Sequence, residues 1–292
     1  MYIVRNHSKK FISAITAVIV LIISLSFVNE YVANAYIPHA TSFSRSYKVY
    51  DAATGQEIDS YILSALPSYS NTRDIIGDDS RVVDFTKSGV VKIMGPTGYY
   101  GTGFVVDSHV IATAAHVVKN KRITSIKLFN SNGTVALTAT PVEYHIYSGF
   151  GSLADDSAFD YALISVEEDL SAYNHFRLGV PTANFDTSNR ALSVTGFPGD
   201  LNNNDATTHT MMTATGNVYN LTNNISNYFL GYTVDTEGGN SGSPVYVTTS
   251  YDENVYFTVV AIHTEGHNSF NRGVRISPDI IHFYLNNDCI YY

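Results

Sequence analysis

The sequence from Val82 onward consists of short apolar runs, and this pattern restricts the fold more than any other feature. The runs are rich in β-branched and aromatic residues and are separated by Gly, Asn, Asp and Pro. Clear examples are residues 90–94, 103–106, 109–113, 191–195 and 256–262. Short strands with frequent turn residues are typical of all-β sandwiches and barrels. We therefore predict an all-β fold.

The C-terminal region departs from this pattern. Ser277 is a suitable N-cap, and Pro278 suits the first turn of a helix. Apolar residues then follow at helical spacing. The residues expected to share one face are Ile280, Ile281, Tyr284 and Leu285. We predict one short C-terminal helix.

The first 73 residues are predicted to serve export and processing. A basic start precedes the uncharged, mostly apolar run of residues 11–28, and the small residues Ala33 and Ala35 follow. This order is that of a signal peptide, 1–35. A retained membrane anchor is the alternative, because a spanning helix needs at least about 18 apolar residues. Residues 36–73 are polar and turn-rich, which indicates a pro-segment. We expect a secreted product without membrane contact after processing.

Charge and cysteine content restrict the partners and the source. Without residues 1–73, 11 basic and 22 acidic residues remain, a net charge of −11. Such a surface disfavours nucleic acid and anionic membranes. The single cysteine, Cys289, cannot form an internal disulfide, although exported proteins of eukaryotes and of the periplasm usually contain disulfides. We expect an extracellular, monomeric protein of a Gram-positive bacterium.

Three short stretches place a histidine, an aspartate and a serine in suitable surroundings. They are Thr113-Ala114-Ala115-His116, Phe159-Asp160-Tyr161-Ala162-Leu163 and Gly238-Gly239-Asn240-Ser241-Gly242-Ser243-Pro244. A serine hydroxyl becomes nucleophilic when a histidine takes its proton, and a buried carboxylate orients that histidine. Asp155 and Asp156 compete with Asp160, but only Asp160 directly precedes an apolar run that would bury it. The order His, Asp, Ser predicts a serine protease.

These stretches resemble the trypsin-like serine peptidases, and more closely the bacterial glutamyl endopeptidases of the V8 type. The resemblance extends from about Asp74 to the C-terminal helix. It implies a chymotrypsin-like double β-barrel, with the first barrel in 74–180 and the second barrel, specificity pocket and terminal helix in 181–292.

The resemblance also implies a role for each residue of the three stretches. His116 would be the general base, Asp160 its orienting partner and Ser241 the nucleophile. The glycines around Ser241 allow a tight turn in which the backbone N–H groups of Gly239 and Ser241 converge on an oxyanion.

Residues beside the nucleophile lead to two different predictions for the substrate. Asp235 lies six residues before Ser241, where trypsin-like enzymes often have an aspartate that favours Lys and Arg. His263 and Thr236 stand where the glutamyl endopeptidases have residues that contact a substrate glutamate. Their N–H and O–H groups can donate to a carboxylate. We predict cleavage after Glu, and less well after Asp, by acyl-enzyme chemistry.

Two neighbouring features bear on this specificity. The main chain of Thr264 to Gly266 would pair with the substrate as an added strand. Glu265, within that segment, would place a negative charge near the pocket and weaken the preference for acidic residues.

The segment 74–81 resembles the mature N-termini of these enzymes, which implies that the freed α-amino group of Asp74 lies near the substrate carboxylate. Cleavage near Arg73 would then complete the site and activate a zymogen. An enzyme specific for Glu should not cut after Arg, so a separate activating protease is expected.

No cofactor or metal is expected. His263 and His267 are four residues apart but lack a zinc motif, and the acidic residues near Asp155 lack a calcium-loop pattern. The expected partners are protein or peptide substrates and the activating protease. Two other interpretations stay open: a trypsin-fold protease of different or narrow specificity, as in exfoliative toxins, and a non-catalytic binding protein.

Overall fold

The computed structural model describes residues 47–51, 75–151, 157–182, 184–187, 189–202, 207–221, 228–251 and 254–286. The chain divides into two compact units, Met1–Phe43 and Ser44–Tyr292. All described residues belong to the second unit. The predicted signal peptide lies outside the described residues, as do Asp74, Asp155 and Asp156.

The first barrel is an eight-stranded antiparallel sheet with the order β1-β8-β9-β5-β4-β3-β6-β7. Its strands are β1 (Tyr47–Asp51), β3 (Val90–Gly95), β4 (Gly98–Asp107), β5 (Val110–Thr113), β6 (Ser125–Phe129), β7 (Val135–Ala139), β8 (Pro141–Tyr147) and β9 (Ala162–Val166). Every residue of β5 and β9 is buried. These two strands are therefore covered on both faces, which explains why they are continuous apolar runs rather than alternating ones.

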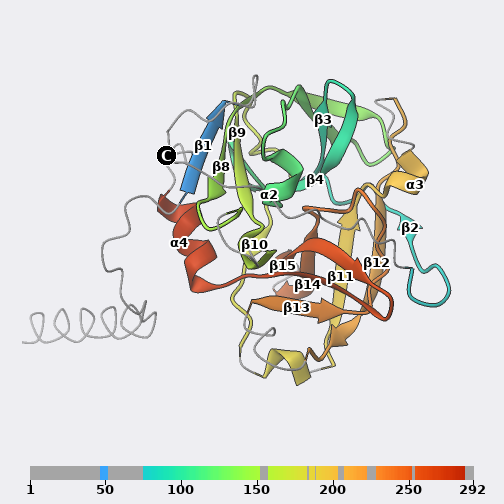
Figure 1. Ribbon diagram of the computed structural model, residues 1–292. Helices are drawn as coiled ribbons and strands as arrows, with labels where there is room; N and C mark the ends of the chain where they lie inside the picture. Colours follow the sequence, from blue (N-terminus) through green and yellow to red (C-terminus); the bar gives the residue numbers. More distant parts are fainter. Residues whose placement is uncertain are drawn as a thin grey trace, which may run out of the picture. The chain divides into compact units, whose positions relative to one another are not determined.

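The second barrel has the strand order β10-β15-β14-β11-β12-β13-β16, and β2 pairs with β12. Its strands are β2 (Val82–Val83), β10 (Arg177–Leu178), β11 (Ala191–Gly196), β12 (Met212–Tyr219), β13 (Phe229–Tyr232), β14 (Pro244–Tyr251), β15 (Asn254–His267) and β16 (Phe270–Arg275). Because β16 pairs with both β13 and β15, this sheet closes on itself. The predicted all-β, double-barrel fold is confirmed (Figure 1).

Helical segments are few and short in the described part of the chain. They are α2 (Ala115–Val118), α3 (Gly199–Asn202), α4 (Pro278–Asn286) and the 3-10 turns η1 (Ser157–Phe159) and η2 (Phe185–Thr187). The helix α4 is the predicted C-terminal helix, and the N–H group of Ile280 donates to the predicted cap, Ser277 Oγ, at 3.3 Å. The predicted apolar face was wrong in one respect: Leu285 is 63% exposed, whereas Phe283 is buried. Phe283 packs edge-on against Tyr161 and Tyr147 of the first barrel, so this face of the helix contacts that barrel.

Apolar burial holds the barrels together. One cluster fills the first barrel and continues to Tyr246 and Ile262 of the second barrel. Another fills the interior of the second barrel around Leu192, Tyr232 and Val245. Each fully buried apolar side chain of this size stabilises the fold by about 1.5–3 kcal/mol. With one cysteine in the chain, this burial takes the place of internal disulfides.

Three segments pair in ways that the sequence did not indicate. The strand β2 pairs with β12, and β10 pairs in parallel with β15, so residues 82–83 and 177–178 join the second sheet although they fall in the range expected for the first barrel. The strand β1 belongs to the predicted pro-segment, and it extends the first sheet beyond β8.

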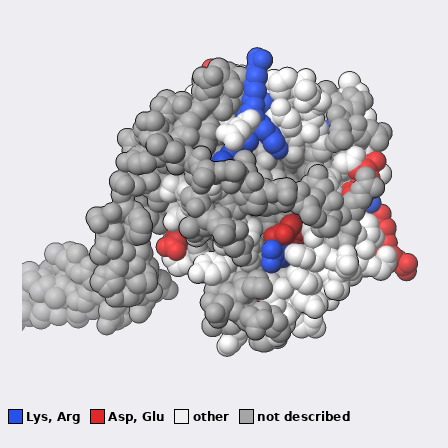
Figure 2. All heavy atoms as spheres, viewed as in Figure 1, with Lys and Arg blue, Asp and Glu red and all other residues white. Residues whose placement is uncertain are grey.

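The described residues include no helix that is both long enough and apolar enough to cross a membrane. On the face shown in Figure 2, the described surface is mostly uncharged, with small separate groups of acidic and basic side chains.

Candidate active site

The position of His116 follows from the end of β5. The apolar strand β5 ends at Thr113, Ala114 follows in an extended conformation, and α2 begins at Ala115. Ala115, Val117 and Val118 are buried, which anchors this single helical turn. His116 remains the partly exposed residue of the turn, with 18% of its side chain accessible.

The register between β5 and β9 brings Asp160 to His116. The strands are antiparallel, and Thr113 at the end of β5 pairs with Ala162 at the start of β9. Asp160 Oδ2 lies 2.6 Å from His116 Nδ1, and Asp160 Oδ1 accepts a hydrogen bond from the His116 backbone N–H at 2.8 Å. Asp160 is fully buried. Its carboxylate therefore holds both the ring and the backbone of the histidine.

A lysine supports the other side of α2. Lys121 Nζ donates to the His116 carbonyl at 2.9 Å and lies 5.1 Å from the centroid of the Tyr100 ring. Burial lowers the pKa of Lys121, while the negative charge of Asp160 opposes that shift. This cation satisfies a backbone carbonyl near the C-terminal end of a very short helix.

The loop that carries Ser241 can be formed only with glycine at two positions. Gly239 has φ of +99° and Gly242 has φ of +85°, which other L-residues rarely adopt. A Cβ atom at Gly239 would lie 2.5 Å from Tyr99 Oη, and one at Gly242 would lie 2.1 Å from the carbonyl oxygen of Thr102. The two glycines therefore permit both the turn and its close contact with β4.

Hydrogen bonds from β4 orient this loop. The Gly239 carbonyl accepts from Tyr99 Oη and, at 3.0 Å, from Thr102 Oγ1. The Ser241 carbonyl accepts from the Thr102 backbone N–H at 2.9 Å. Both carbonyls are thus turned toward the first barrel. Within the described part of the chain, the N–H groups of Gly239 and Ser241 donate no hydrogen bond and are available to a ligand.

Contacts across the two barrels place Ser241 beside the helix of His116. A Cβ atom added at Gly101 would lie 3.0 Å from the Ser241 carbonyl oxygen and within 3.0 Å of both Val117 methyl carbons. A Cβ atom at Gly242 would lie 2.2 Å from Thr113 Oγ1, just before α2. The three predicted residues of the triad are thus carried by segments that contact one another.

His263 is tied to the same loop through its backbone. Its N–H donates to the Ser243 carbonyl at 2.9 Å, and its carbonyl accepts from the Gly242 N–H at 2.8 Å. Its ring is buried, with Nδ1 2.6 Å from Tyr232 Oη. Burial and, secondarily, His116 lower the pKa of His263 to about 3, so the ring is neutral at ordinary pH. Thr236 is also buried, on the segment that leads to the loop.

Asp235 is occupied by the segment that follows Asp74. Its Oδ1 accepts from the Ile76 N–H at 2.7 Å, and its Oδ2 accepts from Ser80, from the N–H at 2.8 Å and from Oγ at 2.5 Å. Only 3% of Asp235 is exposed. The carboxylate is satisfied by the chain itself, which argues against a free acid that selects Lys and Arg substrates.

Glu265 is likewise paired. Its Oε1 accepts from Arg272 Nε at 2.7 Å, and the Arg272 guanidinium lies 4.3 Å from the centroid of the Phe229 ring. The pairing of β15 with β16 produces this contact, because Glu265 is opposite Arg272. Thr264 falls at the β-bulge between His263 and Glu265, where the pairing of β15 with β16 shifts register, and Gly266 continues β15.

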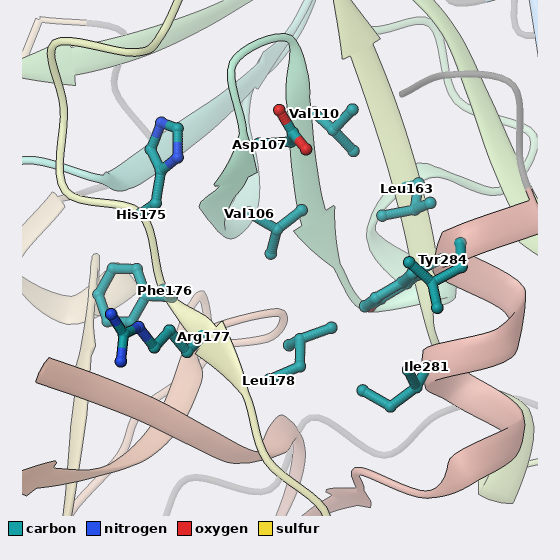
Figure 3. A pocket seen from close by; sticks show the side chains of 11 residues that line it. Val106, Asp107, Val110, Leu163, His175, Phe176, Arg177, Leu178, Ile281 and Tyr284 are labelled. Carbon is teal, nitrogen blue, oxygen red and sulfur yellow. The ribbon is translucent and has the colours of Figure 1, made fainter. Parts of the chain in front are cut away.

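Other features of the described residues lie apart from these side chains. A cavity of about 390 Å³ lies between β4, β5, β9, β10 and α4. Most of its lining is apolar, but Asp107, His175 and Arg177 also line it, and it contains none of the predicted site residues (Figure 3). No group of three or more His, Cys, Asp or Glu side chains in the described residues is placed to hold a metal ion.

Sequence reasoning missed three residues of this site: Tyr99, Thr102 and Tyr232. Tyr99 and Thr102 belong to a glycine-rich stretch, and glycines that allow close backbone approach were a usable signal. Tyr232 is one aromatic residue in an apolar strand, and nothing in the sequence distinguishes it from a core residue.

Comparisons with known proteins find similarity to peptidases. The model of the family "Trypsin-like peptidase domain" matches residues 101–250. The chain is 30% identical over 205 residues to "Extracellular metalloprotease" of Bacillus subtilis, covering 65% of this chain and 59% of that protein. It is 27% identical over 228 residues to "Glutamyl endopeptidase" of Bacillus licheniformis, covering 71% of this chain and 67% of that protein. The chain thus spans about three fifths to two thirds of the length of these two relatives.

A solved structure described as "Structure of Glu endopeptidase in complex with MPD" has the same fold. It aligns with a TM-score of 0.60 and 19% sequence identity, covering 73% of this chain and 98% of that chain. The family model covers half of the chain and includes His116, Asp160 and Ser241. The chain belongs to the family of trypsin-like peptidases.

Proposed function

We propose that the chain is a serine endopeptidase that cleaves after glutamate through an acyl-enzyme intermediate. The observation that carries this proposal is the fully buried Asp160, which holds His116 beside the loop of Ser241. His116 takes the Ser241 proton as Ser241 Oγ attacks the scissile carbonyl, and it then gives that proton to the leaving amine. Water, activated by the same histidine, hydrolyses the ester and restores the serine.

The backbone of the loop supplies the oxyanion site. The N–H groups of Gly239 and Ser241 make no hydrogen bond within the described residues. The carbonyls of their own peptide units are held by the chain, because Gly238 accepts from the Gly199 N–H and Asn240 accepts from the Ser243 N–H. Such preorganised donors stabilise the developing negative charge, and loss of one typically costs about 10²–10³ in kcat.

Preference for glutamate rests on His263 and Thr236. A neutral imidazole and a hydroxyl can each donate to a carboxylate, and a site lined by donors rejects side chains that lack the acceptor. The two carboxylates that would oppose an acidic substrate are already paired, Asp235 with residues 76–80 and Glu265 with Arg272. The backbone at Thr264 and Gly266 would receive the substrate as an added strand.

The segment after the pro-segment supports activation by cleavage. Ile76 and Ser80 are bound to Asp235, which directly precedes Thr236. A new N-terminus at Asp74 or Ile75 would therefore lie within two residues of Ile76, whose N–H is bound to Asp235. We infer that a separate protease cuts near Arg73 and that the new N-terminus completes the glutamate site. Export by the signal peptide 1–35 belongs to the same proposal.

The test is the cleavage pattern of the purified mature protein on a complex peptide library, read by mass spectrometry beside the Ser241→Ala variant. We expect cuts after Glu, fewer after Asp, and none above background for Ser241→Ala. Cuts after Lys and Arg would overturn the specificity. Absence of cuts, with no labelling of Ser241 by a fluorophosphonate, would favour a binding protein. Labelling without library cuts would favour a narrow specificity for one folded substrate.

A variant of the specificity residue adds to this test. His263→Ala should reduce cleavage after Glu far more than it reduces fluorophosphonate labelling of Ser241.

A second experiment concerns activation. The N-terminal sequence of the secreted protein should begin between residues 73 and 75. An N-terminus well away from this junction would contradict the activation proposal and leave the peptidase proposal intact.

A further inference from the structure

Tyr232 is the one hydrogen-bonding partner of the His263 ring in the part of the chain that the structure describes. It is the last residue of β13 and is fully buried. Its Oη lies 2.6 Å from His263 Nδ1, and the two rings are inclined at 56°. This hydrogen bond is formed at the apolar core of the second barrel, to which Tyr232 belongs.

Neither partner carries a charge at ordinary pH. Burial raises the pKa of Tyr232 well above its usual value, with Glu265 adding to the effect. Burial likewise lowers the pKa of His263. The contact therefore joins a neutral phenol and a neutral imidazole, which has one N–H and one bare nitrogen.

The direction of this hydrogen bond follows from the phenol proton. Tyr232 Oη makes no other hydrogen bond among the described residues. If His263 Nδ1–H donated to Tyr232, the phenol proton would be buried without an acceptor, which is unfavourable. If the phenol donates to Nδ1, both groups are satisfied, and the single ring proton is on Nε2.

We propose that Tyr232 is a positioning residue that holds His263 as the Nε2–H tautomer and so makes it a donor to the substrate glutamate. This rests on the proposed function. In the other tautomer, His263 would present the lone pair of Nε2 to the pocket, and that lone pair would repel a carboxylate.

Because the position of His263 is fixed, its tautomer determines whether Nε2 can donate a hydrogen bond. Hydrogen bonds of the His263 N–H to Ser243 and of its carbonyl to Gly242 hold the main chain against the loop that carries Ser241. The residue opposite it in β16 is Gly273, where a Cβ atom would lie 2.3 Å from the Ile262 carbonyl oxygen. These contacts fix the main chain, while the burial of His263 and the contact of Nδ1 with Tyr232 Oη leave the ring little room to turn and present its other nitrogen.

The test compares Tyr232→Phe with Tyr246→Phe in the mature enzyme. Tyr246 is another buried tyrosine of the second barrel, but its Oη contacts Thr195, so it controls for the loss of a buried hydroxyl. We expect Tyr232→Phe to reduce kcat/KM for a Glu peptide about tenfold relative to the matched Gln peptide, through KM. Fluorophosphonate labelling of Ser241, which does not need the pocket, should be unchanged.

The tautomer is measured directly by ¹⁵N NMR of histidine-labelled Ser241→Ala protein, with His263 assigned by loss of its signal in His263→Gln. We expect an Nε2–H ring in the presence of Tyr232 and a mixture of tautomers after Tyr232→Phe. An Nδ1–H ring with Tyr232 present, or an unchanged Glu-to-Gln ratio in Tyr232→Phe, would overturn the inference. If the enzyme with Tyr232 has no preference for Glu over Gln, the proposed specificity fails, whereas the NMR result still decides the tautomer.

Discussion

Two histidines on opposite sides of the site have different buried partners. His116, in the first barrel, has a carboxylate on Nδ1, and His263, in the second barrel, has a phenol on Nδ1. Both contacts measure 2.6 Å. A carboxylate stabilises the imidazolium, so the ring can accept the serine proton and release it. A phenol in an apolar core does not, so the ring stays neutral, and in our proposal it serves as a fixed donor. The partner, rather than the histidine, determines the role.

The largest expected effect comes from Asp160→Asn, which changes the partner of His116 and leaves that of His263 unchanged. The amide keeps the size of the side chain but holds His116 in the wrong tautomer, and kcat should fall about 10⁴-fold for every substrate. The Glu-to-Gln preference should remain, because His263 has its own partner. Steady-state kinetics on paired peptides measures both, and a changed preference would show that the two histidines are not independent.

The pH dependence of stability should reveal the neutral histidine. The pKa of His263 is lowered to about 3 in the folded protein, whereas a histidine in the unfolded chain has a pKa near 6.5. Below about pH 6.5, the unfolded chain binds a proton that the folded protein does not. The free energy of unfolding should therefore fall, by up to about 1.4 kcal/mol per pH unit, down to about pH 3.

Urea unfolding of Ser241→Ala protein between about pH 7 and pH 4 tests this slope without self-digestion. His263→Gln in the same background should reduce the slope by up to one proton. If the free energy of unfolding has the same pH slope in both proteins, His263 takes up its proton in the folded protein over this pH range, and its pKa is not lowered.

Asp235→Asn should affect the N-terminal segment rather than catalysis. Hydrogen bonds to a charged group contribute about 1.5–3 kcal/mol, and the asparagine NH₂ would face the donors of Ser80 or Ile76. We expect a lower Tm and faster hydrogen exchange at residues 76–80. Asp79→Asn, at a carboxylate whose side chain is 49% exposed, is the matched control and should change little. Altered cleavage after Lys or Arg in Asp235→Asn would instead place this carboxylate in the pocket.

The smallest expected effect concerns Glu265. Arg272→Gln would leave the Glu265 carboxylate without its partner, and kcat/KM for Glu peptides should fall a few-fold, about the scale of a partly exposed ion pair. Arg272→Gln with Glu265→Gln should restore it. Failure of the double variant to recover activity would indicate that Arg272 acts through its packing on Phe229.

The first barrel was more predictable from sequence than the second. A histidine that follows a buried strand and an aspartate that precedes another are recognisable locally, and antiparallel pairing of β5 with β9 then joins them. The pocket could not be predicted in the same way. Asp235 has the position of a trypsin-type specificity residue, and its bonds to Ile76 and Ser80 span more than 150 residues of sequence.

Sequence alone determined the all-β class, the terminal helix and the glycines of the loop that carries Ser241, because strand patterns, caps and backbone conformations are local properties. Tertiary structure decided which charges are free. The sequence does not show whether the carboxylates of Asp235 and Glu265 are paired. Asp235 takes its donors from Ile76 and Ser80, more than 150 residues away, and Glu265 takes its donor from Arg272 through the pairing of β15 with β16. The same holds for Tyr232, whose hydroxyl acquires its role because β13 places it against the ring of His263.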